Sequence, residues 1–143
     1  MLIAALLAST VAVAGPDGCE DAVSTVDISA CLSGQLERES DRMDSYFAAV
    51  IARADELGDR IVGADGPEVV EALQLSQSAW LAYRDAECSA TYAWWSDGTI
   101  RGPNTLQCRI DLTRERTRHL WSAYLTHADS SPPVLPEPSS PAP

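Results

Sequence analysis

Residues 73–88 place polar side chains on what would otherwise be the apolar face of a helix. At about 100° per residue, five positions fall within an arc of roughly 80°. They are Leu73, Gln77, Trp80, Arg84 and Cys88. A stripe that contains Leu, Trp and Cys is expected to face a core, where a guanidinium must be paired or must extend its head to water. We therefore expect Arg84 to lie over the indole of Trp80, one turn earlier, and to pair with an acid from another helix.

Two acids are candidates for that partner. Glu39 is the first, because it also lies on an otherwise apolar stripe, and Asp111 is the second. Asp85 is expected to pair with Arg109 or Arg116. This polar cluster either fixes how the helices register or forms a functional site. We favour the structural interpretation, because no His, Ser or Cys nucleophile accompanies the cluster.

The sequence contains no pattern typical of catalysis or of metal binding. Its only two histidines, His119 and His127, belong to no nucleophile or metal constellation, and no pair of carboxylates has a distinctive spacing. We therefore expect no enzymatic activity, no cofactor and no metal.

The four cysteines predict two disulfides, because their number is even and the chain carries a candidate export signal. Gaps of 12, 57 and 20 residues do not show the short C-x₂₋₄-C spacing of most zinc sites. Of the three possible pairings we favour Cys19–Cys31 and Cys88–Cys108, because each closes a local loop.

Residues 1–14 resemble a secretory signal peptide. They are uncharged and largely apolar, and Ala12-Val13-Ala14 is a small-x-small pattern that predicts cleavage after Ala14. The run lacks the usual Lys or Arg before it, but it is far shorter than the ~20 residues that a membrane helix needs. No lipobox precedes Cys19. We expect a periplasmic or secreted protein without a stable membrane anchor after cleavage.

The charge balance is strongly acidic. The formal net charge is −11, with 21 acidic side chains against 10 basic ones. Such a surface repels nucleic acid and anionic lipid and attracts a cationic partner. The alternative is that the acidity only keeps a secreted protein soluble.

Three helical segments must position these residues. Apolar side chains at i+3, i+4 and i+7 predict a first helix over about residues 29–61, with Ser29 as N-cap. A break at 63–67 ends in Pro67, which suits the first turn of a second helix that reaches Trp94 or Trp95. A loop is expected over 96–104, and a third helix from Thr105 to about His127.

These segments predict an all-α fold, a small antiparallel three-helix domain over residues 15–128, stapled by two disulfides. Pro and Ser dominate residues 129–143, so this tail is predicted to be disordered.

Two of these segments resemble the LprI-like lysozyme-inhibitor family. LQLSQSAWLAYRDAEC is similar to the family signature L-x-x-A-Q-x-x-W-x-x-[FY]-R-D-x-x-C, and CRIDLTRERTRHL is similar to C-x-x-x-L-T-x-x-R-x-x-x-L. The matching positions are Leu73, Gln77, Trp80, Tyr83, Arg84, Asp85, Cys88, Cys108, Leu112, Thr113, Arg116 and Leu120. The resemblance runs from about residue 19 to 121 and includes the placing of the first two cysteines. The first-helix motif A-D-x-x-L-N-x-x-Y is degraded here to ESDRMDSYF, and Glu39 is a candidate for the missing acid.

The resemblance implies a secreted or periplasmic protein that binds basic lysozyme and blocks its cleft. Opposite charges would steer the two proteins together, and the two carboxylates of the cleft call for a donor such as Arg or Ser on the blocking loop. The candidate partner-binding residues lie between Cys88 and Cys108: Tyr92, Trp94, Trp95, Ser96, Asp97 and Arg101. Alternatively, Trp94 and Trp95 cover the core and the loop is only a connector. The alternative function is a non-catalytic cell-envelope adaptor or structural protein that binds another cationic or peptidoglycan-linked partner.

Overall fold

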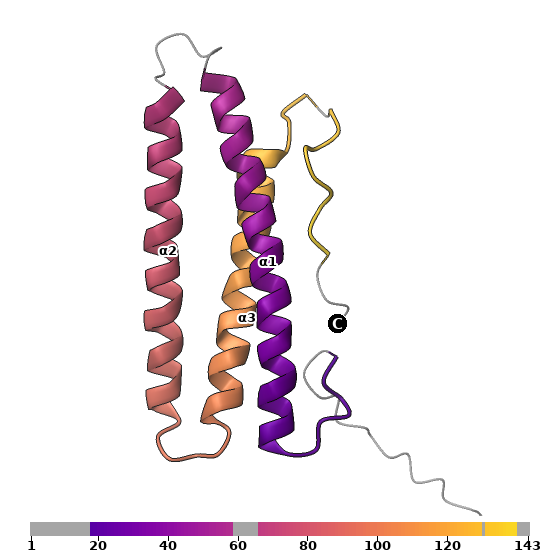
Figure 1. Ribbon diagram of the computed structural model, residues 1–143, viewed down its shortest axis with the longest axis vertical. Helices are drawn as coiled ribbons and strands as arrows, with labels where there is room; N and C mark the ends of the chain where they lie inside the picture. Colours follow the sequence, from indigo (N-terminus) through magenta and orange to yellow (C-terminus); the bar gives the residue numbers. More distant parts are fainter. Residues whose placement is uncertain (1–17, 59–65, 130, 140–143) are drawn as a thin grey trace, which may run out of the picture.

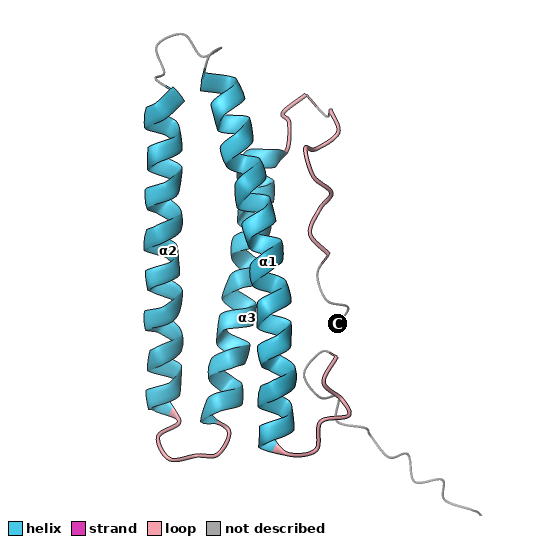
Figure 2. Cartoon of the chain, viewed as in Figure 1, coloured by secondary structure: helices cyan, strands magenta, loops and turns pink. Residues whose placement is uncertain are grey.

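The computed structural model describes residues 18–58, 66–129 and 131–139. It contains three long helices, α1 (Thr25–Gly58), α2 (Gly66–Trp94) and α3 (Arg101–Leu120), and a π-helical turn η1 (Trp121–Leu125) that continues α3. The three helices run antiparallel (Figures 1 and 2), and the described residues form no strand. The predicted all-α three-helix fold is confirmed. The expected signal peptide lies outside the described residues.

Helix α1 begins earlier than predicted, at Thr25. The Ser24 hydroxyl accepts a hydrogen bond from the Asp27 backbone N–H (3.1 Å), and the Asp27 carboxylate accepts from the Ser24 backbone N–H (3.3 Å). This reciprocal pair is a capping box. The prediction of Ser29 as N-cap was wrong: Ser29 lies inside the helix, and its hydroxyl donates to the Thr25 carbonyl at 2.8 Å.

Replacing Ser24 with Ala is expected to lower the free energy of unfolding by about 1 kcal/mol, because the Asp27 backbone N–H in the first turn loses its acceptor, the Ser24 hydroxyl. Denaturant unfolding followed by circular dichroism measures this. Ser78→Ala is the matched control. Ser78 is exposed within α2 and its hydroxyl only donates to the Gln74 carbonyl, so its loss should be nearly neutral. Equal costs for the two variants would contradict the capping role.

The core lies mainly between α1 and the chain from α3 into η1. Its larger cluster contains Met43, Tyr46 and Val50 from α1, with Leu120 and Leu125 from the C-terminal part of the bundle. A smaller cluster, Cys19, Leu32 and Ile110, lies towards the end of the bundle where α1 begins. Apart from Tyr46 and Leu125, these residues lie on the inward stripes that the helical periodicity predicted, or belong to a disulfide.

The connection between α2 and α3 is shorter than the predicted loop. Helix α3 begins at Arg101 rather than Thr105. Pro103 therefore occupies the first helical turn, where a missing backbone N–H costs no hydrogen bond. Gly102 and Pro103 led to the prediction of a loop, although both residues are compatible with the first turn of a helix.

Two disulfides join Cys19 to Cys31 and Cys88 to Cys108, as the sequence favoured. All four cysteines are paired. The first disulfide fixes the segment before α1, and the second joins α2 to α3 close to their connection. Both lie towards the same end of the bundle.

The tail follows a path that its composition did not predict. The sequence predicted disorder from residue 129 onwards, and the structure describes residues 131–139, which form neither helix nor strand and follow the side of the bundle next to α1 (Figure 1). Leu135 packs against the larger core cluster, and Pro138 is buried. Composition alone indicated disorder, because the segment contains too few apolar residues to pack against one another. The helices provide the apolar surface against which Leu135 packs.

In the described part of the chain, none of the helices combines the length and the apolar character needed to cross a membrane.

Candidate interaction surface

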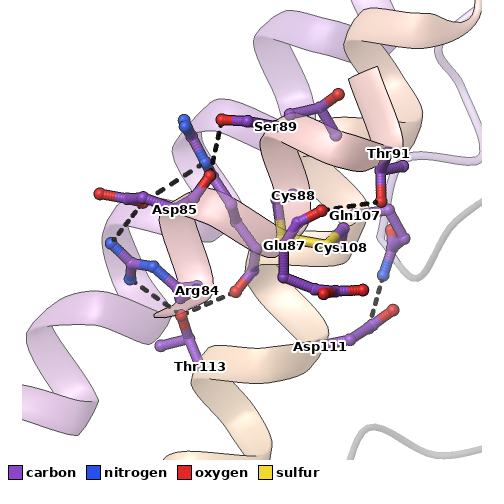
Figure 3. Close-up of a disulfide and its surroundings, with 12 residues drawn as sticks. Arg84, Asp85, Glu87, Cys88, Ser89, Thr91, Gln107, Cys108, Asp111 and Thr113 are labelled. Carbon is purple, nitrogen blue, oxygen red and sulfur yellow. Dashed lines mark hydrogen bonds and ion pairs between the residues drawn. A yellow bond between two sulfur atoms is a disulfide. The ribbon is translucent and has the colours of Figure 1, made fainter. Parts of the chain in front are cut away.

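Arg84 is held between α2 and α3, as its place on the stripe predicted. Its guanidinium carbon lies 5.4 Å from the centre of the Trp80 ring. One terminal nitrogen donates to the Thr113 hydroxyl at 3.2 Å, and the other lies 3.5 Å from the Asp85 carboxylate. Figure 3 shows the contacts of Arg84 with Thr113 and Asp85 beside the Cys88–Cys108 disulfide. Asp85 also faces Arg109, at 3.8 Å, which is one of the two partners expected for it.

The two acids expected to pair with Arg84 do not do so. Glu39 instead accepts a hydrogen bond from Nε of Arg114 at 3.0 Å and forms an ion pair with Arg42 at 3.2 Å. Asp111 accepts from the side-chain amide of Gln107 at 2.8 Å (Figure 3). The sequence predicted that Glu39 faces inward, but it could not tell whether it faces α2 or α3.

Gln77 and Arg116 form a second set of contacts on the same side of α2. Nε of Arg116 donates to the side-chain oxygen Oε1 of Gln77 at 3.0 Å, and its guanidinium lies 5.7 Å from the Trp80 ring centre. The side-chain nitrogen Nε2 of Gln77 donates to the Met43 sulfur of α1 at 3.5 Å. Partial burial lowers the pKa of Arg116 from its ordinary value. Trp80 therefore lies within reach of two guanidinium groups.

These contacts join α2 to α3, and Gln77 reaches α1. We propose that the cluster sets the register of α2 against its neighbours, because its hydrogen bonds are satisfied in one alignment only. Leu73 of the same motif packs against the larger core cluster, and Leu112 is half-buried on α3. Tyr83 differs from them, since its side chain is 54% exposed.

One end of the bundle exposes large apolar side chains. We call this surface the aromatic end; it combines the start of α1 with the connection between α2 and α3. Its members are Val23, Val26, Tyr92, Trp94, Trp95 and Ile100. Trp94 is 85% exposed and Val26 is 75% exposed. Isolated exposed apolar residues are ordinary, but a contiguous group of them marks an interaction site.

The two parts of the aromatic end meet in a shallow groove beside Tyr92. This groove is lined from α1 by Thr25, Val26 and Ser29, and on its other side by Thr99 of the connection and by Arg101 and Gly102 of the first turn of α3. The sequence indicated the aromatic residues between Cys88 and Cys108 as one group, but Val23 and Val26 were not predicted to join them. Both residues could have been recognised as exposed apolar residues in the sequence, because neither belongs to the repeating inward stripe of α1.

Arg101 holds the connection in shape. Its Nη1 atom donates to the Ser96 carbonyl at 2.7 Å, and its guanidinium carbon lies 4.8 Å from the Tyr92 ring centre. Ser96 has φ of 49°, a left-handed conformation that non-glycine residues seldom adopt. Arg101 was predicted to donate hydrogen bonds to a partner, but its Nη1 atom already donates to the Ser96 carbonyl within the turn. Ser96 and Asp97 remain exposed.

Among the residues that the structure describes, no three His, Cys, Asp or Glu side chains are placed to hold a metal ion.

The fold and this surface define a class of protein: a small helical domain, stapled by disulfides, that exposes an aromatic surface to its surroundings. Two disulfides are typical of proteins outside the reducing cytosol. The family model described as "Lysozyme inhibitor LprI" matches residues 17–120, so the chain belongs to the LprI lysozyme-inhibitor family. The tail along α1 lies outside the matched residues.

A relative from Rhizobium meliloti (strain 1021), described as "Uncharacterized protein R02472", is 30% identical over 109 residues, which cover 73% of this chain and 76% of the relative. No solved structure matches the chain. Together with the disulfides, the family indicates an extracellular or periplasmic protein.

Proposed function

We propose that this protein binds a basic lysozyme through the aromatic end and blocks its cleft, without catalysis of its own. Membership of the family supports lysozyme as the partner. The observation that carries the choice of surface is Trp94, the last residue of α2, which is 85% exposed on the segment closed by the Cys88–Cys108 disulfide. A rigid, exposed Trp is the kind of side chain that anchors interfaces at low ordering cost.

The six residues singled out in the sequence have different parts in this proposal. Trp94 and Trp95 supply apolar surface, and Tyr92 forms one wall of the groove. Arg101 fixes the turn, and the exposed hydroxyl of Ser96 is the donor available to a cleft carboxylate. Asp97 adds negative charge beside them.

Acidic side chains surround the aromatic end and suit a cationic partner. Exposed acids precede α1, lie in its first turn, and occur at the end of α2 and in the connection: Glu20, Asp21, Asp27, Glu87 and Asp97. Hydrogen bonds from the backbone N–H groups of Glu20 itself and of Gly18 lower the pKa of Glu20, so this carboxylate is ionised at neutral pH. The negative electrostatic potential of these carboxylates raises the rate of encounter with a basic protein.

Neutralising the acids at this end is expected to slow association. The double variant Asp27→Asn/Asp97→Asn should lower the association rate constant for a basic lysozyme about three- to tenfold at low ionic strength. The control, Asp55→Asn/Glu56→Gln, removes the same charge about 42 Å away along α1, far beyond the Debye length of about 10 Å at 0.1 M salt. It should change the rate less than twofold. Surface plasmon resonance at several salt concentrations measures both, and equal effects would contradict local steering.

A lysis-protection assay tests the function as a whole. The purified protein should slow the lysis of bacterial cell walls by a basic animal-type lysozyme, and the two proteins should bind at low salt. If they do not bind even in dilute buffer, the partner is another cationic or peptidoglycan-linked molecule. Turnover of a glycan or peptide by the protein alone would instead show an enzyme.

A further inference from the structure

The C-terminal segment lies in a groove that recognises its backbone. The phenolic hydroxyl of Tyr46, from α1, donates to the Pro136 carbonyl at 2.7 Å. The indole N–H of Trp121, from η1, donates to the Leu135 carbonyl at 3.0 Å. The Val134 backbone N–H donates to the Leu125 carbonyl at 2.8 Å. Two aromatic side chains from different elements thus bind consecutive carbonyls of one segment.

Two side chains of the segment are partly or fully buried against the bundle. Leu135 packs against the core cluster that includes Tyr46, and Pro138 is buried farther along. Val134, between Pro133 and Leu135, is 45% exposed. The chain bends at Val134 and Leu135, and the prolines on either side of these residues restrict its conformations before it binds. The contacts require a Leu-Pro step whose two carbonyls face the two aromatic donors, rather than this one sequence.

The far end of the groove is basic, although the protein is acidic. Pro138 and Ser139 lie in a small pocket lined by Arg42, Arg114 and Arg118, with Glu39 as its one acid. Glu39 already pairs with Arg42 and with Arg114, and Glu137 of the segment is exposed and does not line this pocket. The segment is therefore recognised through its backbone carbonyls and the Leu135 side chain rather than through charge.

We infer that this groove is a binding site for a proline-containing segment of another protein with a Leu-Pro step, and that residues 133–138 occupy it as a built-in competing ligand. The groove is formed by the middle of α1 and by η1, away from the aromatic end, and does not depend on the proposed function. The held segment is short, and its tether gives it an effective concentration on the order of millimolar. A partner segment of the same chemistry can therefore replace it.

The test uses a labelled peptide of residues 131–139 and the full chain. Leu135→Asp should displace the tail, because it places a charge in the core cluster. Fluorescence anisotropy should then show at least tenfold tighter binding of the peptide to this variant than to the unaltered chain. Val134→Asp is the matched control: it adds the same charge at the neighbouring exposed position and should behave as the unaltered chain. A peptide that itself carries Leu135→Asp should not bind.

Removing the donors separates recognition from non-specific binding. In the Leu135→Asp chain, Tyr46→Phe or Trp121→Phe should each weaken peptide binding about fivefold, because each removes one hydrogen bond to a carbonyl. Equal binding of the peptide to all variants, or no binding to Leu135→Asp while its circular dichroism stays native, would overturn the inference.

The unaltered chain gives a second measurement that does not depend on how Leu135→Asp folds. Excess unlabelled peptide should exchange with the tail of an isotope-labelled chain and move the Val134 backbone amide resonance towards its random-coil position in NMR spectra, because the displaced tail loses its hydrogen bond to the Leu125 carbonyl. An unshifted Val134 resonance at millimolar peptide would contradict the inference. A concentration-dependent dimer that excess peptide does not dissociate would assign the groove to the tail of a second copy instead.

Discussion

Replacing Trp94 with Ala is expected to weaken binding to a basic lysozyme at least thirtyfold while leaving the stability of the protein unchanged. The side chain is 85% exposed, so its removal takes almost no packing from the folded state. At a central interface position, a truncated Trp costs about 2 kcal/mol or more, which corresponds to roughly thirtyfold in Kd. Isothermal titration calorimetry gives the affinity, and denaturant unfolding gives the stability.

The control for Trp94 is another exposed apolar residue far from the aromatic end. Leu75, on the N-terminal half of α2, is 72% exposed, and Leu75→Ala should change neither affinity nor stability. Inhibition that survives Trp94→Ala in full would show that the lysozyme-binding surface lies elsewhere on the domain. The exposed Tyr83 would then be the next residue to replace.

Removing the Cys88–Cys108 disulfide is expected to lower the free energy of unfolding far more than Trp94→Ala does. The double variant Cys88→Ala/Cys108→Ala should lose about 3 kcal/mol, because a loop of some 20 residues regains its freedom in the unfolded chain. Cys88 is fully buried, so replacing it with the smaller alanine also removes packing contacts around the side chain. The same variant should weaken lysozyme binding, because the turn that carries Trp94 is no longer closed and must be ordered on binding.

Comparison with the other disulfide separates these two effects. Cys19→Ala/Cys31→Ala opens a loop of similar size and should cost a similar free energy of unfolding, about 3 kcal/mol. It leaves the connection between α2 and α3 closed, so binding should fall much less. If both double variants lose affinity equally at a temperature where both are folded, the binding surface depends on the whole end of the bundle rather than on the turn.

Much of this structure followed from local patterns in the sequence. Inward-facing residues repeat along α1, so Leu32, Met43 and Val50 could be placed in the core before the fold was known. The disulfides were predictable because each closes a short loop. The contact between Arg84 and Trp80 was predictable because both lie on one helix, one turn apart. In each case the interacting residues are close in sequence, or belong to one helical face.

The partners across helices were not predictable in the same way. Helical periodicity gives the direction of a side chain about its own axis, but not which neighbour lies in that direction. Glu39 therefore faces inward as expected, yet meets Arg114 instead of Arg84. In the same way, Val26 is adjacent to the Tyr92 groove only because the start of α1 packs beside the connection between α2 and α3.

The sequence by itself determined the three helices, their apolar faces, the disulfide pairing and the aromatic composition of one turn, because these depend on residues near one another in the chain. Only the tertiary structure decided the ion pairs between helices, the joining of two segments into the aromatic end, and the course of residues 131–139. A proline-rich segment has no internal hydrogen bonds to hold it. It is ordered here because Tyr46 and Trp121, brought together by α1 and η1, donate to its carbonyls.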